Sequence, residues 1–159
     1  MAEKNSINLD DPRSIVGSRV FDAPRELVFA AFADPQHLAQ WWGPDGFTLT
    51  THSFEFRIGG VWRFVMHGPD GRDYQNQVTY DEIVPPEHIA YHHGGGDDVE
   101  PVRFTTGVTF EDLGNRQTRI VWHGTFPSAE ERARVIREYG ADKGLAQTLA
   151  RLAEHLAAN

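Results

Sequence analysis

Apolar residues change their spacing along the chain, and each change predicts a different kind of element. Residues 14–21, SIVGSRVF, are rich in β-branched side chains and predict a strand. In the next segment Val28, Ala31 and Phe32 follow at i, i+3 and i+4, which places them on one face of a helix. Pro24 suits the first turn of this helix, because the N–H that proline lacks would have no helical partner there. The pattern therefore begins with a strand and a helix.

A second short helix is predicted around a pair of adjacent tryptophans. Leu38, Trp41 and Trp42 repeat the helical spacing, and Gly43-Pro44 ends it. This spacing puts both indole rings on the inward face of the helix, so we expect them to be buried. They either anchor the helix to the sheet as part of a filled core or form one wall of a cavity.

From residue 47 to residue 126 the pattern is that of β-strands. β-Branched and aromatic residues alternate with polar ones, and clusters of Gly, Pro, Asn and Asp separate the segments. Gly-Pro-Asp-Gly at 68–71 is a strong hairpin signal. Short turns between successive strands predict an antiparallel meander. The six predicted strands are 47–58, 60–68, 72–84, 88–93, 102–112 and 117–126.

The chain ends in helices. Ser128 and Glu131 have the spacing of a capping box, and the helix that they begin reaches about residue 139, where Gly140 interrupts it. An apolar stripe marks a longer final helix, and an apolar sheet face needs such a cover. The sequence thus predicts an α+β helix-grip fold, in which a curved antiparallel sheet of about seven strands wraps around a long C-terminal helix. The stripe is formed by Leu145, Leu149, Leu152 and Leu156.

Large aromatic side chains recur at alternate positions of the predicted strands. Alternate residues face the same side of a sheet, so these rings share one concave face with the tryptophans and the final helix. A close-packed core needs much of this bulk, but the number of rings favours a cup that is not completely filled. Tyr80 and Tyr91 add hydroxyl groups, which need a partner when buried. The predicted cavity-lining residues are Trp41, Trp42, Phe54, Phe56, Trp62, Phe64, Met66, Tyr80, Tyr91, Phe104, Phe110, Trp122, Leu145 and Leu149.

Composition narrows the class of protein. The 159 residues suit one domain, with 1–12 expected to be a flexible N-terminus and 13–158 a single domain. The net charge of −8 comes without a basic patch, so no nucleic-acid partner is expected. No apolar run approaches the ~20 residues that cross a bilayer, and the N-terminus lacks the apolar core of a secretion signal. The chain has no cysteine, which suits a reducing compartment, and we expect a cytoplasmic protein.

The sequence offers no recognisable catalytic or metal-binding motif. His92 and His93 lie close to Asp97-Asp98, but neighbouring strand residues point to opposite faces and do not chelate one ion together. No serine has the setting of a nucleophile elbow, and RIGGVW (57–62) lacks the Lys-Ser/Thr of a phosphate loop. No catalytic residue, metal or cofactor is therefore predicted.

The order and spacing of several segments resemble a known family. These segments are APRELVFAAFADPQHLAQWWGP (23–44), FEFRIGGVWRF (54–64), GPDG (68–71), YDEIVPPEHI (80–89) and the Leu-rich final helix. Together they resemble the activator of Hsp90 ATPase homologue 1-like (AHSA1-like) family of the START/Bet v 1-like helix-grip superfamily, over residues 14–157. The chain departs from the family's pattern at Phe56, Val78 and Leu145, where pocket lining is expected.

The resemblance implies a small cup-shaped domain that holds a hydrophobic or amphipathic molecule between the sheet and the C-terminal helix. Relatives in the wider superfamily cyclise polyketides or hydroxylate rings, so a cyclase- or hydrolase-like enzyme is one alternative. The family's name makes an Hsp90-related co-chaperone or stress-response interaction module another. The resemblance also suggests a homodimer.

Overall fold

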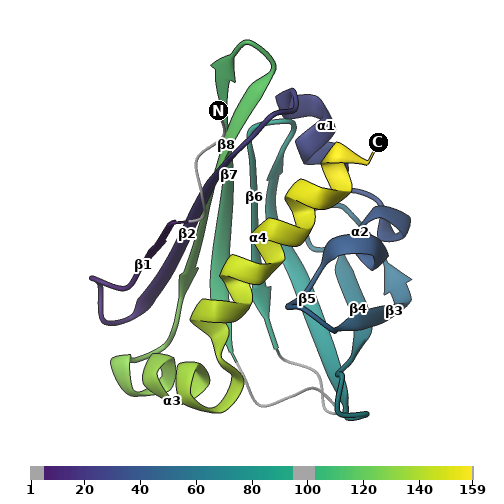
Figure 1. Cartoon of the computed structure of the whole chain (residues 1–159). Coiled ribbons are helices and arrows are strands. Elements are labelled where there is room, and N and C mark those ends of the chain that lie inside the picture. The colour runs from purple at the N-terminus through teal and green to yellow at the C-terminus, as the bar shows by residue number, and fades with distance from the viewer. Residues whose placement is uncertain (1–5, 95–102, 159) are drawn as a thin grey trace.

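The computed structural model, which describes residues 6–94 and 103–158, has an α+β fold built on one curved sheet (Figure 1). Neighbouring strands are antiparallel throughout, in the order β1-β2-β8-β7-β6-β5-β4-β3. Helix α4 (Ala141–Ala157) runs diagonally across the concave face of the sheet (Figure 1). The strands are β1 (Ser6–Asn8), β2 (Ser14–Phe21), β3 (Thr48–Phe54), β4 (Val61–His67), β5 (Asp73–Val84), β6 (His88–His93), β7 (Phe104–Gly114) and β8 (Gln117–Thr125).

The predicted helix-grip architecture is confirmed, with eight strands in place of about seven. The additional strand is β1, which pairs with Val16, Gly17 and Ser18 of β2. It lies in the segment that we expected to be flexible, so residues 6–8 are instead tied to the edge of the sheet. Three residues are too few to show an alternating pattern, and the open edge of β2 supplies the hydrogen bonds that hold them.

The two short helices after β2 are present, as predicted. They are α1 (Arg25–Ala30) and α2 (Pro35–Trp41). Helix α2 begins where the Asp34 carboxylate accepts a hydrogen bond of 2.8 Å from the backbone N–H of Gln36. It ends between the two tryptophans, because Trp42 already has extended backbone. The tryptophans therefore leave the backbone in different directions, which the helical spacing alone did not predict.

The first of the two C-terminal helices begins and ends where the sequence predicts, and the long final helix follows it. The Ser128 hydroxyl accepts a hydrogen bond of 3.0 Å from the Glu131 N–H, and α3 (Ala129–Tyr139) follows. Gly140 takes a left-handed conformation with φ 63°, which ends α3 and lets α4 begin at the next residue. In the apolar stripe of α4, Leu149 and Leu152 are fully buried. This stripe packs α4 against the sheet and covers the core.

The turn between β3 and β4 depends on a glycine. A Cβ atom at Gly60 would collide with the backbone oxygen of Glu55, which cannot move without distorting the turn. Two backbone hydrogen bonds to Tyr80 also hold the turn in place. The Gly59 N–H donates to the backbone oxygen of Tyr80 at 2.7 Å, and the backbone oxygen of Gly60 accepts from the Tyr80 N–H at 2.9 Å. This turn closes one end of the aromatic core. None of the helices formed by the described residues is long and apolar enough to cross a membrane.

Candidate functional site

Two adjoining pockets lie between the concave face of the sheet and the helices. The first, which we call the α4 pocket, has a volume of about 240 Å³ and is bounded by β2, β6, β7, β8 and α4. The second, the β5 pocket, has a volume of about 350 Å³ and extends from there towards β4, β5 and α3. Pockets of a few hundred Å³ suit a small molecule. Both are lined by Trp42, Met66, Tyr91, Phe104 and Tyr139.

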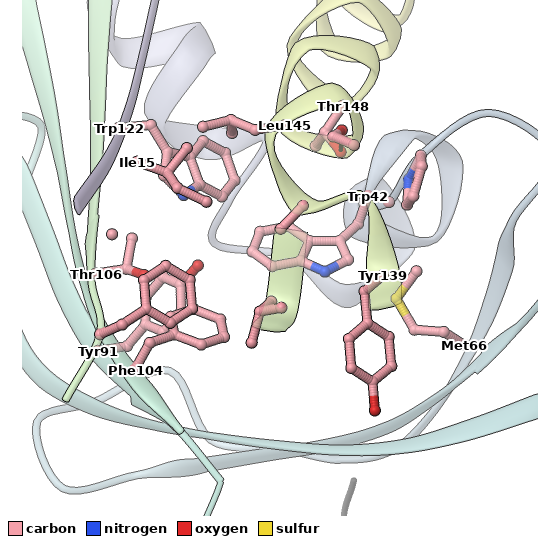
Figure 2. Close-up of a pocket in the computed structure, with 17 residues that line it drawn as sticks. Ile15, Trp42, Met66, Tyr91, Phe104, Thr106, Trp122, Tyr139, Leu145 and Thr148 are labelled. Carbon is pink, nitrogen blue, oxygen red and sulfur yellow. Dashed lines mark hydrogen bonds between the residues drawn. The ribbon is translucent and has the colours of Figure 1, made fainter. Parts of the chain in front are cut away.

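The walls of the α4 pocket come from segments that are far apart in the sequence. Figure 2 shows Tyr91, Phe104 and Thr106 on the sheet side, with Trp42, Leu145 and Thr148 facing them from the helix side. Ile15 of β2 and Trp122 of β8 close one end, and Met66 of β4 lies at the other (Figure 2). The lining is therefore mostly apolar and aromatic, which suits a ligand that buries an apolar surface.

The predicted cavity-lining residues fall into three groups. Seven of them line one or both pockets: Trp42, Phe64, Met66, Tyr91, Phe104, Trp122 and Leu145. Trp62 and Tyr80 border only a gap of about 10 Å³, no larger than a water molecule. The others line neither pocket and belong to the packed core, so for them the filled-core interpretation fits the structure. These are Trp41, Phe54, Phe56, Phe110 and Leu149.

The adjacent tryptophans have different roles. Trp41 is fully buried, and its indole N–H donates a hydrogen bond of 3.1 Å to the backbone oxygen of Ala31. Trp42 is partly exposed, lines both pockets, and packs against Trp62 and Trp122 with ring centroids 5.1 and 5.4 Å away. Trp41 therefore anchors α2, and Trp42 forms a pocket wall.

Sequence reasoning missed several residues of the α4 pocket, above all Thr106 and Gly124. A signal for both was present, because Thr106 lies between Phe104 and Val108 on the inward-facing positions of one strand. In the same way, Gly124 follows Trp122 at the next inward position of β8. Other missed residues are Ile15, Phe126, Val135, Tyr139 and Thr148, which only the packing of β2, α3, α4 and the segment after β8 brings to the pocket.

Three polar groups of the sheet meet in the α4 pocket. Burial raises the pKa of the Tyr91 hydroxyl well above its usual value, although the Thr106 hydroxyl and the Trp122 indole N–H lie close enough to lower that pKa in part. Tyr91 is thus a neutral phenol that can donate a proton in a hydrogen bond. Thr106 pairs across the ladder with Gly124, where a Cβ would lie 3.9 Å from the Thr106 hydroxyl oxygen. The glycine therefore leaves open space beside this hydroxyl.

Charge is confined to the outer end of the site. Among the described residues, those lining the α4 pocket include no carboxylate, histidine, lysine or arginine. The β5 pocket adds Asn76, His93 and the exposed Glu138, which pairs with Arg134 at 3.1 Å. The Nε2 atom of His93 lies 2.6 Å from the Asn76 side-chain oxygen. The site therefore has a neutral inner end and a polar outer end.

The two adjacent histidines point away from each other, as the strand pattern predicts. His93 lines the β5 pocket and stacks on Phe104 with ring centroids 4.9 Å apart, whereas His92 lies 2.9 Å from the Asp81 carboxylate. Asp97 and Asp98, which the sequence places near this pair, lie outside the described residues. No three metal-ligating side chains come together anywhere in residues 6–94 and 103–158.

Comparisons with known proteins place the chain in a family. Residues 22–157 match the family described as activator of Hsp90 ATPase homolog 1-like protein. The solution structure of a protein from Arthrobacter aurescens is 27% identical, with a TM-score of 0.88 over 97% of this chain and 92% of that one. Protein Ms6760 from Mycobacterium smegmatis is 26% identical, with a TM-score of 0.84 over 99% of each chain. Protein CV1439 from Chromobacterium violaceum is 29% identical, with a TM-score of 0.75 over 91% of this chain and 97% of that one.

No curated protein matches the chain. The match over residues 22–157 shows that the chain belongs to the activator of Hsp90 ATPase homolog 1-like family.

Proposed function

We propose that this protein binds a small, uncharged and largely apolar molecule in the α4 pocket, with room for a second group of the ligand in the β5 pocket. The observation that carries the proposal is the lining of the α4 pocket, where Trp42, Tyr91, Phe104 and Trp122 surround a space of about 240 Å³. Transfer of apolar surface into such a space contributes about 25 cal/mol per Å² before the cost of ordering the ligand. An ionised ligand would lose its hydration there without meeting an opposite charge.

Binding is favoured over the enzyme alternative by the ionisable groups of the site. The α4 pocket offers two tyrosines, Tyr91 and Tyr139, and burial keeps Tyr91 protonated. A general base needs a pKa near the working pH, which a buried phenol does not have. An enzyme would have to use His93 or Glu138 of the β5 pocket instead. The Hsp90-related alternative is supported by the family's description alone.

The four tryptophans allow a direct test with naphthalene as the apolar probe. Each indole N–H gives its own signal in a ¹H–¹⁵N spectrum of labelled protein. Trp42 and Trp122 line the α4 pocket, whereas the N–H groups of Trp41 and Trp62 donate to Ala31 and Thr51 inside the core. We expect naphthalene to shift the first two signals strongly, with a dissociation constant on the order of 10–100 µM, as small apolar ligands give.

A pocket-filling variant supplies the control. Gly124→Val adds a side chain at an inward position where the Cβ itself meets only ordinary van der Waals contacts, so the pocket becomes smaller. Thr125→Val, one residue further on the opposite face of β8, leaves the pocket unchanged. We expect Gly124→Val to lose naphthalene binding and Thr125→Val to keep it. Equal binding by the two folded variants, or no shift in the parent protein, would contradict the proposed function.

A further inference from the structure

Among the described residues, one buried serine or threonine hydroxyl makes no hydrogen bond of normal geometry. Four serine and threonine side chains are buried among the described residues: Ser14, Thr106, Thr118 and Thr148. Three of them donate hydrogen bonds, Ser14 to the Asp11 carboxylate at 3.1 Å, Thr118 to the Ala23 oxygen at 2.7 Å and Thr148 to the Gly144 oxygen at 2.8 Å. Thr106, which is 3% exposed, makes no hydrogen bond of normal geometry in the described part of the chain, although the Tyr91 hydroxyl lies close to it. Buried polar groups in native proteins are rarely left this way, so Thr106 calls for an explanation.

The surroundings of Thr106 place its hydroxyl at the wall of the α4 pocket. It lies on β7 at an inward position, and its neighbour across the ladder, Gly124, has no side chain to fill the space beside it. The Tyr91 hydroxyl and the Trp122 indole lie near it on the same wall of the pocket (Figure 2). The Thr106 hydroxyl, a neutral phenol and an indole N–H thus lie together at one end of the pocket.

We propose that the Thr106 hydroxyl, with the Tyr91 hydroxyl beside it, donates a hydrogen bond to a neutral oxygen acceptor of the ligand, most simply a carbonyl oxygen, at the inner end of the α4 pocket. This inference rests on the proposed function and names the chemical class of the ligand: an apolar, ring-containing molecule that carries a ketone, quinone or lactone oxygen. Its apolar body lies against Trp42, Phe104 and Leu145, and its oxygen points towards β7.

The count of protons favours an acceptor on the ligand. Trp122 N–H can only donate, and the Tyr91 and Thr106 hydroxyls each carry one proton to donate. If the indole donates to the phenol oxygen and the phenol donates to the threonine oxygen, the threonine proton still has no acceptor. A carbonyl oxygen supplies that acceptor. A carboxylate would also accept, but no lysine or arginine lines the α4 pocket to offset the loss of its hydration.

A matched pair of ligands tests this inference separately from the proposed function. The pair is 2-acetylnaphthalene and 2-isopropenylnaphthalene, which differ by replacement of the carbonyl oxygen with a CH₂ group of similar size. Affinities are measured by titration calorimetry for the parent protein, for Thr106→Val and for Thr105→Val. Thr105 precedes Thr106 on β7, is exposed and faces the opposite side of the sheet, so it controls for the substitution itself.

We expect the parent protein and Thr105→Val to bind the ketone about 3- to 10-fold more tightly than the hydrocarbon, the ratio that one hydrogen bond gives. In Thr106→Val the ratio should fall to about 1, while the affinity for the hydrocarbon stays the same. If both ligands bind and the ratio in Thr106→Val equals that of the parent protein, the oxygen site is wrong and the proposed function stands. If neither ligand binds the parent protein, both proposals are wrong.

Discussion

The same substitution at two buried threonines should change stability in opposite directions. Thr106 and Thr118 are 3% and 0% exposed, and both face the concave side of the sheet. The Thr118 hydroxyl donates to the Ala23 oxygen at 2.7 Å, whereas Thr106 makes no hydrogen bond of normal geometry within the described residues. Valine keeps the approximate shape of threonine and replaces only the hydroxyl with a methyl group. The substitution therefore isolates the value of one buried hydroxyl in each place.

The magnitudes follow from the state of each hydroxyl. An unpaired buried hydroxyl costs about 1–3 kcal/mol, so Thr106→Val should raise the free energy of unfolding by about 1–2 kcal/mol. For a chain of this size that corresponds to an increase in Tm of about 2–8 °C. Thr118→Val leaves the buried Ala23 oxygen without its donor and should lower the free energy of unfolding by about 1–3 kcal/mol.

Urea unfolding followed by circular dichroism measures both variants against the parent protein. The slope of the free energy against urea concentration should stay constant, because the surface exposed on unfolding does not change. Equal destabilisation by the two substitutions would refute the reasoning, because it would mean that the Thr106 hydroxyl already has a partner in the ligand-free protein. A stabilised Thr106→Val that also loses its preference for the ketone would show that this residue favours binding at the expense of stability.

Three further predictions concern other parts of the fold. Trp41→Ala should lower the free energy of unfolding by about 3–5 kcal/mol in urea titrations, because it empties the core, whereas Trp42→Ala should cost less and abolish naphthalene binding in calorimetry. Gly60→Ala should cost about 1–3 kcal/mol in the same titrations, because the added Cβ collides with backbone. Burial and, to a smaller extent, the charge of His37, whose Nδ1 lies 2.8 Å from Nε2 of His155, lower the pKa of His155 below its usual 6.5. Unfolding then takes up a proton, so this contribution to stability is fully present above about pH 6.5 and is lost as the pH falls below it. His155→Gln should therefore flatten the dependence of stability on pH between about 7.5 and 5.5, and an unchanged slope would contradict the lowered pKa.

Local patterns were enough to predict most of the elements. The alternation in 47–126 reflects side chains that face opposite sides of a sheet, and the stripe on the final helix reflects one buried face. Both periods belong to a single element, so they can be read without its neighbours. Caps are local as well, which is why Ser128 and Gly140 mark the ends of α3 as predicted. β1 escaped prediction because its pairing depends on the edge of β2 and not on its own pattern.

The sequence also determined whether a strand side chain faces inwards or outwards. It did not determine whether an inward side chain packs in the core or lines a pocket. Phe110 and Phe104 share one face of β7, yet Phe110 packs against Phe29 and Phe32 while Phe104 lines both pockets. The difference comes from the helices, because α1 and α2 fill one end of the cup and α4 leaves the other end open.

The tertiary structure alone decided the character of the site. Thr106, Tyr91 and Trp122 come from three strands, and antiparallel pairing of β6, β7 and β8 brings them to one wall. A sequence shows that each can face inwards, but a hydrogen bond depends on distances of a fraction of an ångström between residues remote in the chain. The alternating pattern therefore determined the sheet and its inner face, and the packing of α4 across that face decided which polar groups of the described residues line the pocket.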